Sequence, residues 1–225
     1  MAERTYGQFC GFARAVEVVG ERWAFLIIRD LLARPKRFTD LLNGLPGIPT
    51  NVLTTRLKEL EQAGVLRRRV LPRPAGSIVY ELTEHGAELE DTVMALGRWG
   101  AKTLDTPREG EIITVDSLIM AFRTIFQAHE ARGVTVSYEL RFGDIVLHIR
   151  IDKGKIRVGA GPLPEADLIL EAGPGIKALM AGEITPAQAL ADGTVHIVRG
   201  TRKEFVRFAQ LFKIDVSPAQ QQALA

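Results

Sequence analysis

The sequence is poor in the features that mark secreted, membrane-bound or disulfide-stabilised proteins. Its 225 residues contain one cysteine, Cys10, which cannot form an intramolecular disulfide and is too few for a structural zinc site. No stretch approaches the ~18 to 20 uninterrupted apolar residues of a membrane helix. The N-terminal segment MAERTYGQFC lacks the basic-then-apolar layout of a secretory signal. We therefore expect a cytoplasmic protein that does not insert into membranes.

Known catalytic motifs are also missing from the sequence. It contains no glycine-rich phosphate loop, no G-x-S-x-G nucleophile elbow and no H-E-x-x-H pair of zinc ligands. The four histidines are scattered along the chain, at His85, His129, His148 and His196. We expect no enzymatic activity, no cofactor and no metal.

What the sequence does contain is a composition typical of globular proteins, with 46% apolar and 25% charged residues. At ~100 to 150 residues per domain, the length allows one large domain or two small ones. A segment with a proline, a glycine and alternating charges separates two patterned halves and is interpreted as a linker. The predicted organisation is a first domain at 1–104, a linker at 105–114, a second domain at 115–215 and a tail at 216–225.

The charged residues are unevenly distributed along the chain. The net charge is only +2, but residues 29–73 contain ten basic and four acidic residues. A concentrated basic zone is typical of a nucleic-acid-binding element, although a solvated basic surface would give the same count. The charge therefore points to a partner only in combination with the pattern of helices and strands.

The first half has the periodicity of helices followed by a hairpin. Apolar residues at helical spacing predict four helices, at 9–19, 22–32, 37–44 and 50–63. Two extended runs around a proline-rich tip and a last helix follow, at 65–70, 77–82 and 87–104. This order predicts a winged helix-turn-helix domain.

The helix that begins at Thr50 has an apolar stripe on one side and short polar side chains on the other. Such side chains can reach base edges or phosphates when the helix lies in a major groove, and arginines in the hairpin would contact the DNA backbone. The alternative is an ordinary amphipathic surface helix. The candidate DNA contacts are Arg37, Thr39, Thr50, Asn51, Thr54, Thr55, Lys58, Arg67, Arg69 and Arg73.

Five motifs in this half occur in a fixed order: VVGERW at 18–23, LIIRDLL at 26–32, RFTDL at 37–41, VLTTRLKELE at 52–61 and YELT at 80–83. With these motifs, residues 9–100 closely resemble the HxlR family of bacterial winged-helix transcription regulators. The resemblance implies a homodimer that binds double-stranded DNA at an inverted-repeat operator. It places the helix from Thr50 in the major groove and the hairpin around Pro72 as the wing. It also implies dimerisation through the first and last helices, roughly 9–19 and 89–99.

Two further positions, Pro49 and Cys10, bear on the recognition helix and on regulation. Pro49 stands where the family usually has a serine as helix N-cap, so we expect Thr50 to cap the helix and the helix to start one residue later. Cys10 lies where some regulators that resemble this family place a redox-sensing cysteine. Two interpretations stay open: a redox sensor, which needs exposure and a lowered pKa, or a small buried residue of the dimer helix.

The second half follows the order helix, four strands, two short helices, strand, helix. The predicted elements are at 117–131, 134–142, 145–151, 155–159, 166–171, 174–180, 185–191, 193–200 and 203–212. This order resembles the sterol carrier protein type 2 fold, which implies a pocket for an apolar or lipid-like molecule. The expected lining residues are Phe122, Phe126, Leu147, Leu168, Leu179, Phe205 and Phe208. The alternative is that these side chains fill an ordinary core and that the domain is an interaction or dimer-reinforcing module.

The sequence thus predicts an α+β protein: a winged helix-turn-helix domain followed by a sterol-carrier-like domain with a five-stranded, mainly antiparallel sheet and helices. The predicted function is that of a homodimeric bacterial transcription regulator whose DNA binding is modulated by an apolar small-molecule effector. The competing hypothesis is a protein-interaction or lipid-carrying adaptor in which the winged helix serves dimerisation.

Overall fold

A computed structural model describes residues 5–72, 76–104, 107–173 and 175–214. The chain divides into two compact units, residues 1–93 and 94–225. This division falls inside helix α6 (Glu90–Ala101), whereas the sequence places the linker at 105–114. The expected tail at 216–225 lies outside the described residues.

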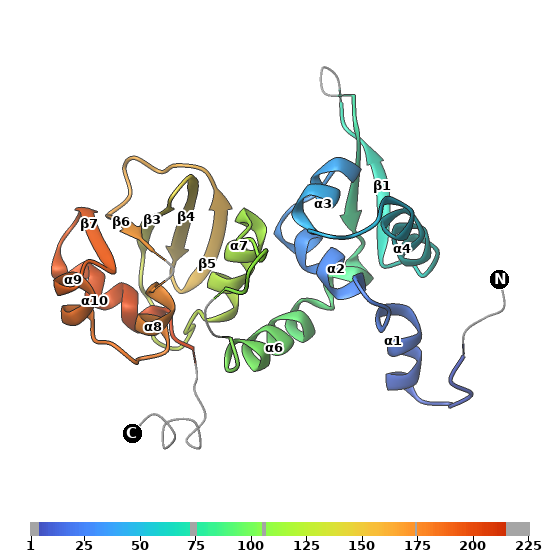
Figure 1. The fold of residues 1–225 in the computed structure, drawn as a ribbon, viewed down its shortest axis with the longest axis horizontal. Coiled ribbons are helices and arrows are strands. Elements are labelled where there is room, and N and C mark those ends of the chain that lie inside the picture. The colour runs from blue at the N-terminus through green and yellow to red at the C-terminus, as the bar shows by residue number, and fades with distance from the viewer. Residues whose placement is uncertain (1–4, 73–75, 105–106, 174, 215–225) are drawn as a thin grey trace. The chain divides into compact units, whose positions relative to one another are not determined.

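The N-terminal unit consists of helices and one hairpin (Figure 1). Its elements before α6 are α1 (Gly11–Val19), α2 (Ala24–Ala33), α3 (Phe38–Gly44), α4 (Thr50–Gln62), β1 (Leu66–Val70), β2 (Ile78–Leu82) and α5 (Glu84–Ala87). β1 and β2 pair antiparallel, with Leu66 opposite Leu82. Lys36, two residues before α3, extends this hairpin, because the backbones of Lys36 and Tyr80 exchange hydrogen bonds of 2.9 and 2.7 Å. The predicted winged helix-turn-helix architecture is therefore confirmed.

The core of this unit forms between α2, α3, α4 and the start of β1. α4 contributes Leu53, Leu57 and Leu60, which are spaced three or four residues apart and are almost completely buried. Burial of one such side chain stabilises the fold by roughly 1.5–3 kcal/mol. The inward stripe thereby determines which side of α4 remains at the surface.

Two helices of this unit start later than the sequence predicts. α1 begins at Gly11 instead of Phe9, and the Phe9 side chain is fully exposed. α2 begins at Ala24 instead of Arg22, because Trp23 adopts a left-handed backbone with φ 82°. The Arg22 guanidinium lies over the Trp23 ring, 5.2 Å from its centre, and this contact favours the unusual conformation.

The last predicted helix of the first half, 87–104, corresponds to α6 but is shorter at both ends, and a separate short helix, α5, precedes it. α5 is a short turn whose N-cap Thr83 accepts a hydrogen bond from the Gly86 amide and donates one to the Gly64 carbonyl. The backbone of Gly86 packs so closely on Val65, the residue before β1, that a Cβ atom there would lie 1.9 Å from the Val65 carbonyl oxygen. α6 then begins at Glu90 and ends at Ala101, so Leu104 lies beyond the helix.

The C-terminal unit contains a five-stranded sheet in the order β5-β4-β3-β6-β7. Its elements are α7 (Val115–Thr124), β3 (Val136–Phe142), β4 (Ile145–Asp152), β5 (Lys155–Ala160), β6 (Leu168–Ala172), α8 (Ile176–Met180), α9 (Pro186–Ala191), β7 (Val195–Arg199) and α10 (Arg202–Leu211). Only the pairing of β3 with β6 is parallel, and the other three are antiparallel. The expected five-stranded, mainly antiparallel sheet with helices is confirmed.

The two faces of this sheet differ. Alternate residues such as Tyr138, Leu140 and Leu170 are fully buried on the face that packs against α7 and α10. The other face is polar, and the β5–β6 connection, residues 161–167, crosses it. There the Leu163 amide donates to the carboxylate of Glu139, a β3 residue that is 1% exposed.

α7 is shorter than the predicted helix 117–131. It ends at Thr124, because the following residues leave the helix to pair with the segment after α10. Phe126 forms a bridge with Phe212, and the Lys213 amide donates to the Ile125 carbonyl at 3.0 Å.

Candidate nucleic-acid interface

α4 exposes the polar side chains that the sequence assigns to it. Its five candidate contacts are all exposed, opposite the buried leucine stripe: Thr50, Asn51, Thr54, Thr55 and Lys58. They lie on the first two and a half turns of the helix, which is the part of a recognition helix that reaches base edges in helix-turn-helix proteins. The structure therefore brings this predicted set together on one accessible surface.

Two threonines of this surface are oriented by the helix itself. The hydroxyls of Thr54 and Thr55 donate to the carbonyls of Thr50 and Asn51, at 2.8 and 2.9 Å. These bonds use the hydroxyl protons and leave the oxygen lone pairs and the methyl groups outward. Each side chain can then accept a hydrogen bond from a base amino group or contact a thymine methyl group.

The start of α4 differs from the expectation that Thr50 caps it. The helix already begins at Thr50, and Pro49 occupies the N-cap position with extended backbone angles. Proline lacks a side-chain oxygen that could accept from the first helical amides, so these amides stay available to solvent or a ligand. A hollow of about 310 Å³ lies beside this end of the helix, lined by Arg22, Trp23, Gly47, Pro49, Val52 and Arg56.

Three arginines of β1, Arg67, Arg68 and Arg69, are paired with acidic side chains. Arg67 and Arg69, two residues apart on β1, both donate to the carboxylate of Glu81 on β2, with Nε–O distances of 2.9 and 2.7 Å. Hydrogen bonds from both arginines hold the pKa of Glu81 below its ordinary value, and the bond from Arg69 has the larger effect. Glu81 is therefore ionised at neutral pH, and this group of three side chains has a net charge of only +1.

The third wing arginine points to a different partner. Arg68 alternates to the other side of β1, and its Nε donates to Glu61 of α4 at 2.9 Å. This ion pair joins the wing to the recognition helix. Glu61 and Glu81 were not selected as functional residues from the sequence. For Glu81 the sequence did contain a signal, because an acidic residue in one strand of a hairpin faces three arginines in the other.

The remaining candidate contacts lie elsewhere in the unit. Arg37 and Thr39 are exposed at the start of α3, where the Arg37 amide donates to Asp40 at 2.9 Å and so caps the helix. Arg73 lies outside the described residues.

Cys10 precedes α1 and is exposed in the single chain. Hydrogen bonds from the backbone amides of Ala13 and Phe12 hold the pKa of its thiol below its usual value. A lowered pKa increases the fraction of reactive thiolate.

The expected apolar pocket residues of the C-terminal unit cluster between its sheet and helices. Phe126 is half-buried and the other six are buried: Phe122, Leu147, Leu168, Leu179, Phe205 and Phe208. Their rings pack together with Tyr138 and Phe212. The ring centres lie 4.9 Å apart for Phe208 and Phe212 and 5.2 Å apart for Tyr138 and Phe208.

The described residues form neither a candidate metal site nor a membrane-spanning helix. Among the described residues, no group of three or more histidine, cysteine, aspartate or glutamate side chains could hold a metal ion. Within the same residues, no helix combines the length and the apolar character needed to cross a bilayer.

The N-terminal unit is thus a winged helix-turn-helix domain with an exposed polar recognition helix and an arginine-bearing wing, a class of domain that binds DNA. The sequence model of HxlR-like helix-turn-helix proteins matches residues 18–108. The chain belongs to the HxlR-like helix-turn-helix family. Residues 109–225 lie outside the match.

Two curated relatives agree with this assignment. The HTH-type transcriptional regulator YodB of Bacillus subtilis is 39% identical over 85 residues, which are 38% of this chain and 76% of that protein. The uncharacterised HTH-type regulator YvaP of the same species is 36% identical over 94 residues, 42% of this chain and 87% of that protein. A solved structure of the redox regulator HypR in its oxidised form is 30% identical and covers 43% of this chain and 100% of that one, with a TM-score of 0.40.

Proposed function

We propose that the protein is a homodimeric transcription regulator that binds an inverted-repeat operator. The observation that carries this proposal is the exposed polar surface of α4 beside the wing arginines, in a chain of the HxlR-like family. In the proposed complex α4 lies in the major groove, with Asn51, Thr54 and Thr55 at base edges. Arg37, Thr39, Lys58, Arg67, Arg69 and Arg73 contact the backbone.

Exposed apolar side chains support the dimer. Phe12 on α1 and Trp99 on α6 are 77% and 72% exposed in the single chain. Aromatic side chains are enriched at protein interfaces, and both helices belong to the segments that the family resemblance assigns to dimerisation. Light scattering should give the mass of two chains, and a monomer mass at operator-binding concentrations would contradict this part of the proposal.

The DNA-binding proposal is tested with Asn51→Ala and Arg69→Ala, measured by fluorescence anisotropy on the promoter next to the protein's own gene and on random DNA. Asn51→Ala should lose ~1–3 kcal/mol on the specific site only, because it removes a base contact. Arg69→Ala should weaken binding to both DNAs and reduce the salt slope, because it removes a phosphate contact. Arg157→Ala, an exposed arginine of the C-terminal unit, is the control.

An equal loss on both DNAs for Asn51→Ala would assign Asn51 to phosphate contact. Absence of specific binding by the unmodified protein would favour the second candidate, an interaction or lipid-carrying adaptor in which the winged helix serves dimerisation. The exposed aromatic residues of α1 and α6 are the observation in favour of that candidate.

We also propose that the C-terminal unit, at about 115–215, binds an apolar or lipid-like effector between its sheet and helices, as its resemblance to sterol carrier proteins implies. One feature supports a ligand there. Within the described residues, the buried hydroxyl of Tyr138 has no hydrogen-bond partner although it lies in the aromatic layer. A ligand with one polar group would satisfy it. Unchanged operator affinity before and after removal of co-purifying lipid would contradict an effector role.

Cys10 adds a redox hypothesis. Its exposure and lowered thiol pKa are the two properties that a peroxide-reactive cysteine needs. Peroxide should change operator affinity in the unmodified protein but not in Cys10→Ser, and an unchanged affinity in the former would exclude the sensor.

A further inference from the structure

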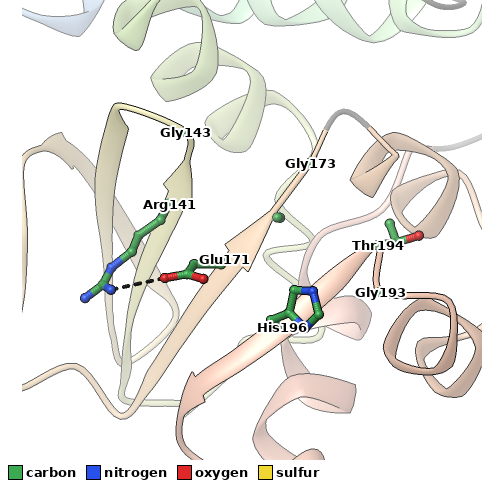
Figure 2. A pocket seen from close by; sticks show the side chains of 8 residues that line it. Arg141, Gly143, Glu171, Gly173, Gly193, Thr194 and His196 are labelled. Atoms are coloured by element: carbon green, nitrogen blue, oxygen red, sulfur yellow. Dashed lines mark hydrogen bonds and ion pairs between the residues drawn. The ribbon is translucent and has the colours of Figure 1, made fainter.

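Three polar side chains form a row across the polar face of the C-terminal sheet. Arg141 on β3 is paired in register with Glu171 on β6, and Glu171 with His196 on β7. Figure 2 shows the three side chains on adjacent strands, with the guanidinium of Arg141 directed to the carboxylate of Glu171. This row is separate from the buried aromatic cluster around Tyr138 and Phe208, and it is not part of the winged helix-turn-helix domain.

A hollow lies next to this row because the neighbouring positions have almost no side chains. Two residues further along β3 and β6, the chain has Gly143 and Gly173, and Thr194 lies two residues before His196. A Cβ atom built on Gly143 or Gly173 would meet no atom within 4 Å. The resulting hollow has a volume of about 240 Å³, and all six of these residues line it (Figure 2).

The hollow presents both a cation and an anion to solvent. The Nε of Arg141 donates to the buried carboxylate of Glu139 at 2.8 Å, which fixes the guanidinium in place. Its Nη1 reaches Glu171 only at a long 3.4 Å, and the side chains of Arg141 and Glu171 are 37% and 52% exposed. Such an exposed, long ion pair contributes little to stability, so a ligand can replace it at little cost.

The edge of the hollow at β7 is held rigid by a turn. Both the amide and the hydroxyl of Thr194 donate to the carboxylate of Asp192, at 2.9 and 2.6 Å. The oxygen of Thr194 therefore keeps its acceptor capacity, and the His196 imidazole beside it supplies one donor and one acceptor when neutral.

From this geometry we infer that the hollow binds a small zwitterion such as an α-amino acid. The ligand carboxylate would take the free donors of Arg141, and its ammonium would take the carboxylate of Glu171. A simple anion would pair only with Arg141 and a simple cation only with Glu171, whereas a molecule with both charges matches both partners. The small volume restricts the ligand to a compact one. This site goes beyond the proposed function and needs no DNA binding.

The test is isothermal titration calorimetry of the full-length protein with L-alanine, L-glutamine, acetate and ethylamine. At least one amino acid should bind, and acetate and ethylamine should bind at least tenfold more weakly. Binding of none of these probes, or equal binding of acetate or ethylamine, would overturn the inference.

Two variants test the site itself. Glu171→Gln removes the proposed ammonium partner and should weaken amino-acid binding at least tenfold. Gly173→Leu fills the hollow and should abolish it, with Gly173→Ala as the milder version should the leucine variant fail to fold. Glu165→Gln, an exposed carboxylate outside the hollow, is the matched control and should bind like the unmodified protein. Unchanged binding in Glu171→Gln would place the amino acid elsewhere and overturn the assignment.

Discussion

At the scale of single residues, the hydroxyl of Tyr138 is a buried polar group in an apolar environment. It is buried between β3 and α10, and no hydrogen-bond partner was found for it among the described residues. Burial raises the pKa of this hydroxyl well above its usual value. The ring itself packs well, with Phe208 and Phe212 at 5.2 and 6.2 Å between centres. The buried hydroxyl of Tyr138 therefore destabilises the fold, whereas the packing of its ring stabilises it.

The substitution Tyr138→Phe keeps the ring and removes the unsatisfied hydroxyl. Because an unsatisfied buried polar group costs ~1–3 kcal/mol, the variant should be at least as stable as the unmodified protein at pH 7. Above pH ~10 the unfolded tyrosine ionises while the folded one does not, so the unmodified protein loses stability as the pH rises and the variant loses less. Denaturant unfolding at pH 7 and pH 11 measures both effects. A less stable variant at pH 7 would show that the hydroxyl has a partner.

At the scale of elements, the wing holds its own counter-ion. Glu81 neutralises one of the two positive charges of Arg67 and Arg69 and fixes both side chains on one side of β1. When DNA binds, phosphates must compete with this carboxylate for the same guanidinium groups. The pairing thus orders the arginines and also weakens their attraction to DNA.

Glu81→Gln should therefore tighten DNA binding. The variant adds one unit of positive charge to the wing, so we expect higher affinity for both operator and random DNA. The plot of log K against log salt should steepen by about one. Anisotropy titrations between low and moderate salt measure both quantities, with Glu165→Gln as the control for loss of an exposed carboxylate in the C-terminal unit. An unchanged slope would mean that Arg67 and Arg69 do not contact phosphates.

The glycines at the two ends of the α5–α6 region make a matched pair. Gly86→Ala should destabilise the protein by ~1–3 kcal/mol or more, because its Cβ would lie 1.9 Å from the Val65 carbonyl oxygen. Gly100→Ala, where a Cβ meets no atom within 4 Å, should be neutral or stabilising by up to ~1 kcal/mol. Thermal unfolding of both variants tests the contrast, and similar shifts would contradict the close contact at Gly86.

The elements that the sequence predicts well are those whose pattern is local. The leucine stripe of α4 and the alternation in β3 and β4 depend on residues near in sequence, and these elements are within two residues of their predicted bounds. The end of α7 could not be predicted, because Phe126 leaves the helix for a partner 86 residues away, at Phe212. The exposed residues of α4 were predictable because they follow from the local pattern of that helix. The role of Glu81 was not, because it depends on which residues of β1 and β2 lie opposite each other in the hairpin.

At the scale of the whole molecule, each unit has its own apolar core. Leu57 is buried in the N-terminal unit and Phe208 in the C-terminal unit. Two compact units with separate cores should melt as separate cooperative units. The sequence predicted two domains from composition and patterning alone, since a linker-like segment separated two patterned halves.

Calorimetry should accordingly resolve two transitions. Leu57→Ala should lower one of them and Phe208→Ala the other, by amounts that correspond to ~2–5 kcal/mol for a large-to-small change in a core. The exposed substitution Arg157→Ala should move neither. A single transition that both core variants lower equally would show that the units unfold together.

The connection 161–167 contains an amide proton, that of Leu163, whose exchange with water should be unusually slow. A surface connection ordinarily exchanges its amide protons with water quickly and independently of the sheet beneath it. Here the Leu163 amide is bound to the carboxylate of Glu139, which is 1% exposed on the central strand β3. That proton is released only when the carboxylate is uncovered, so a loop amide should exchange on the slow time scale of the central strands.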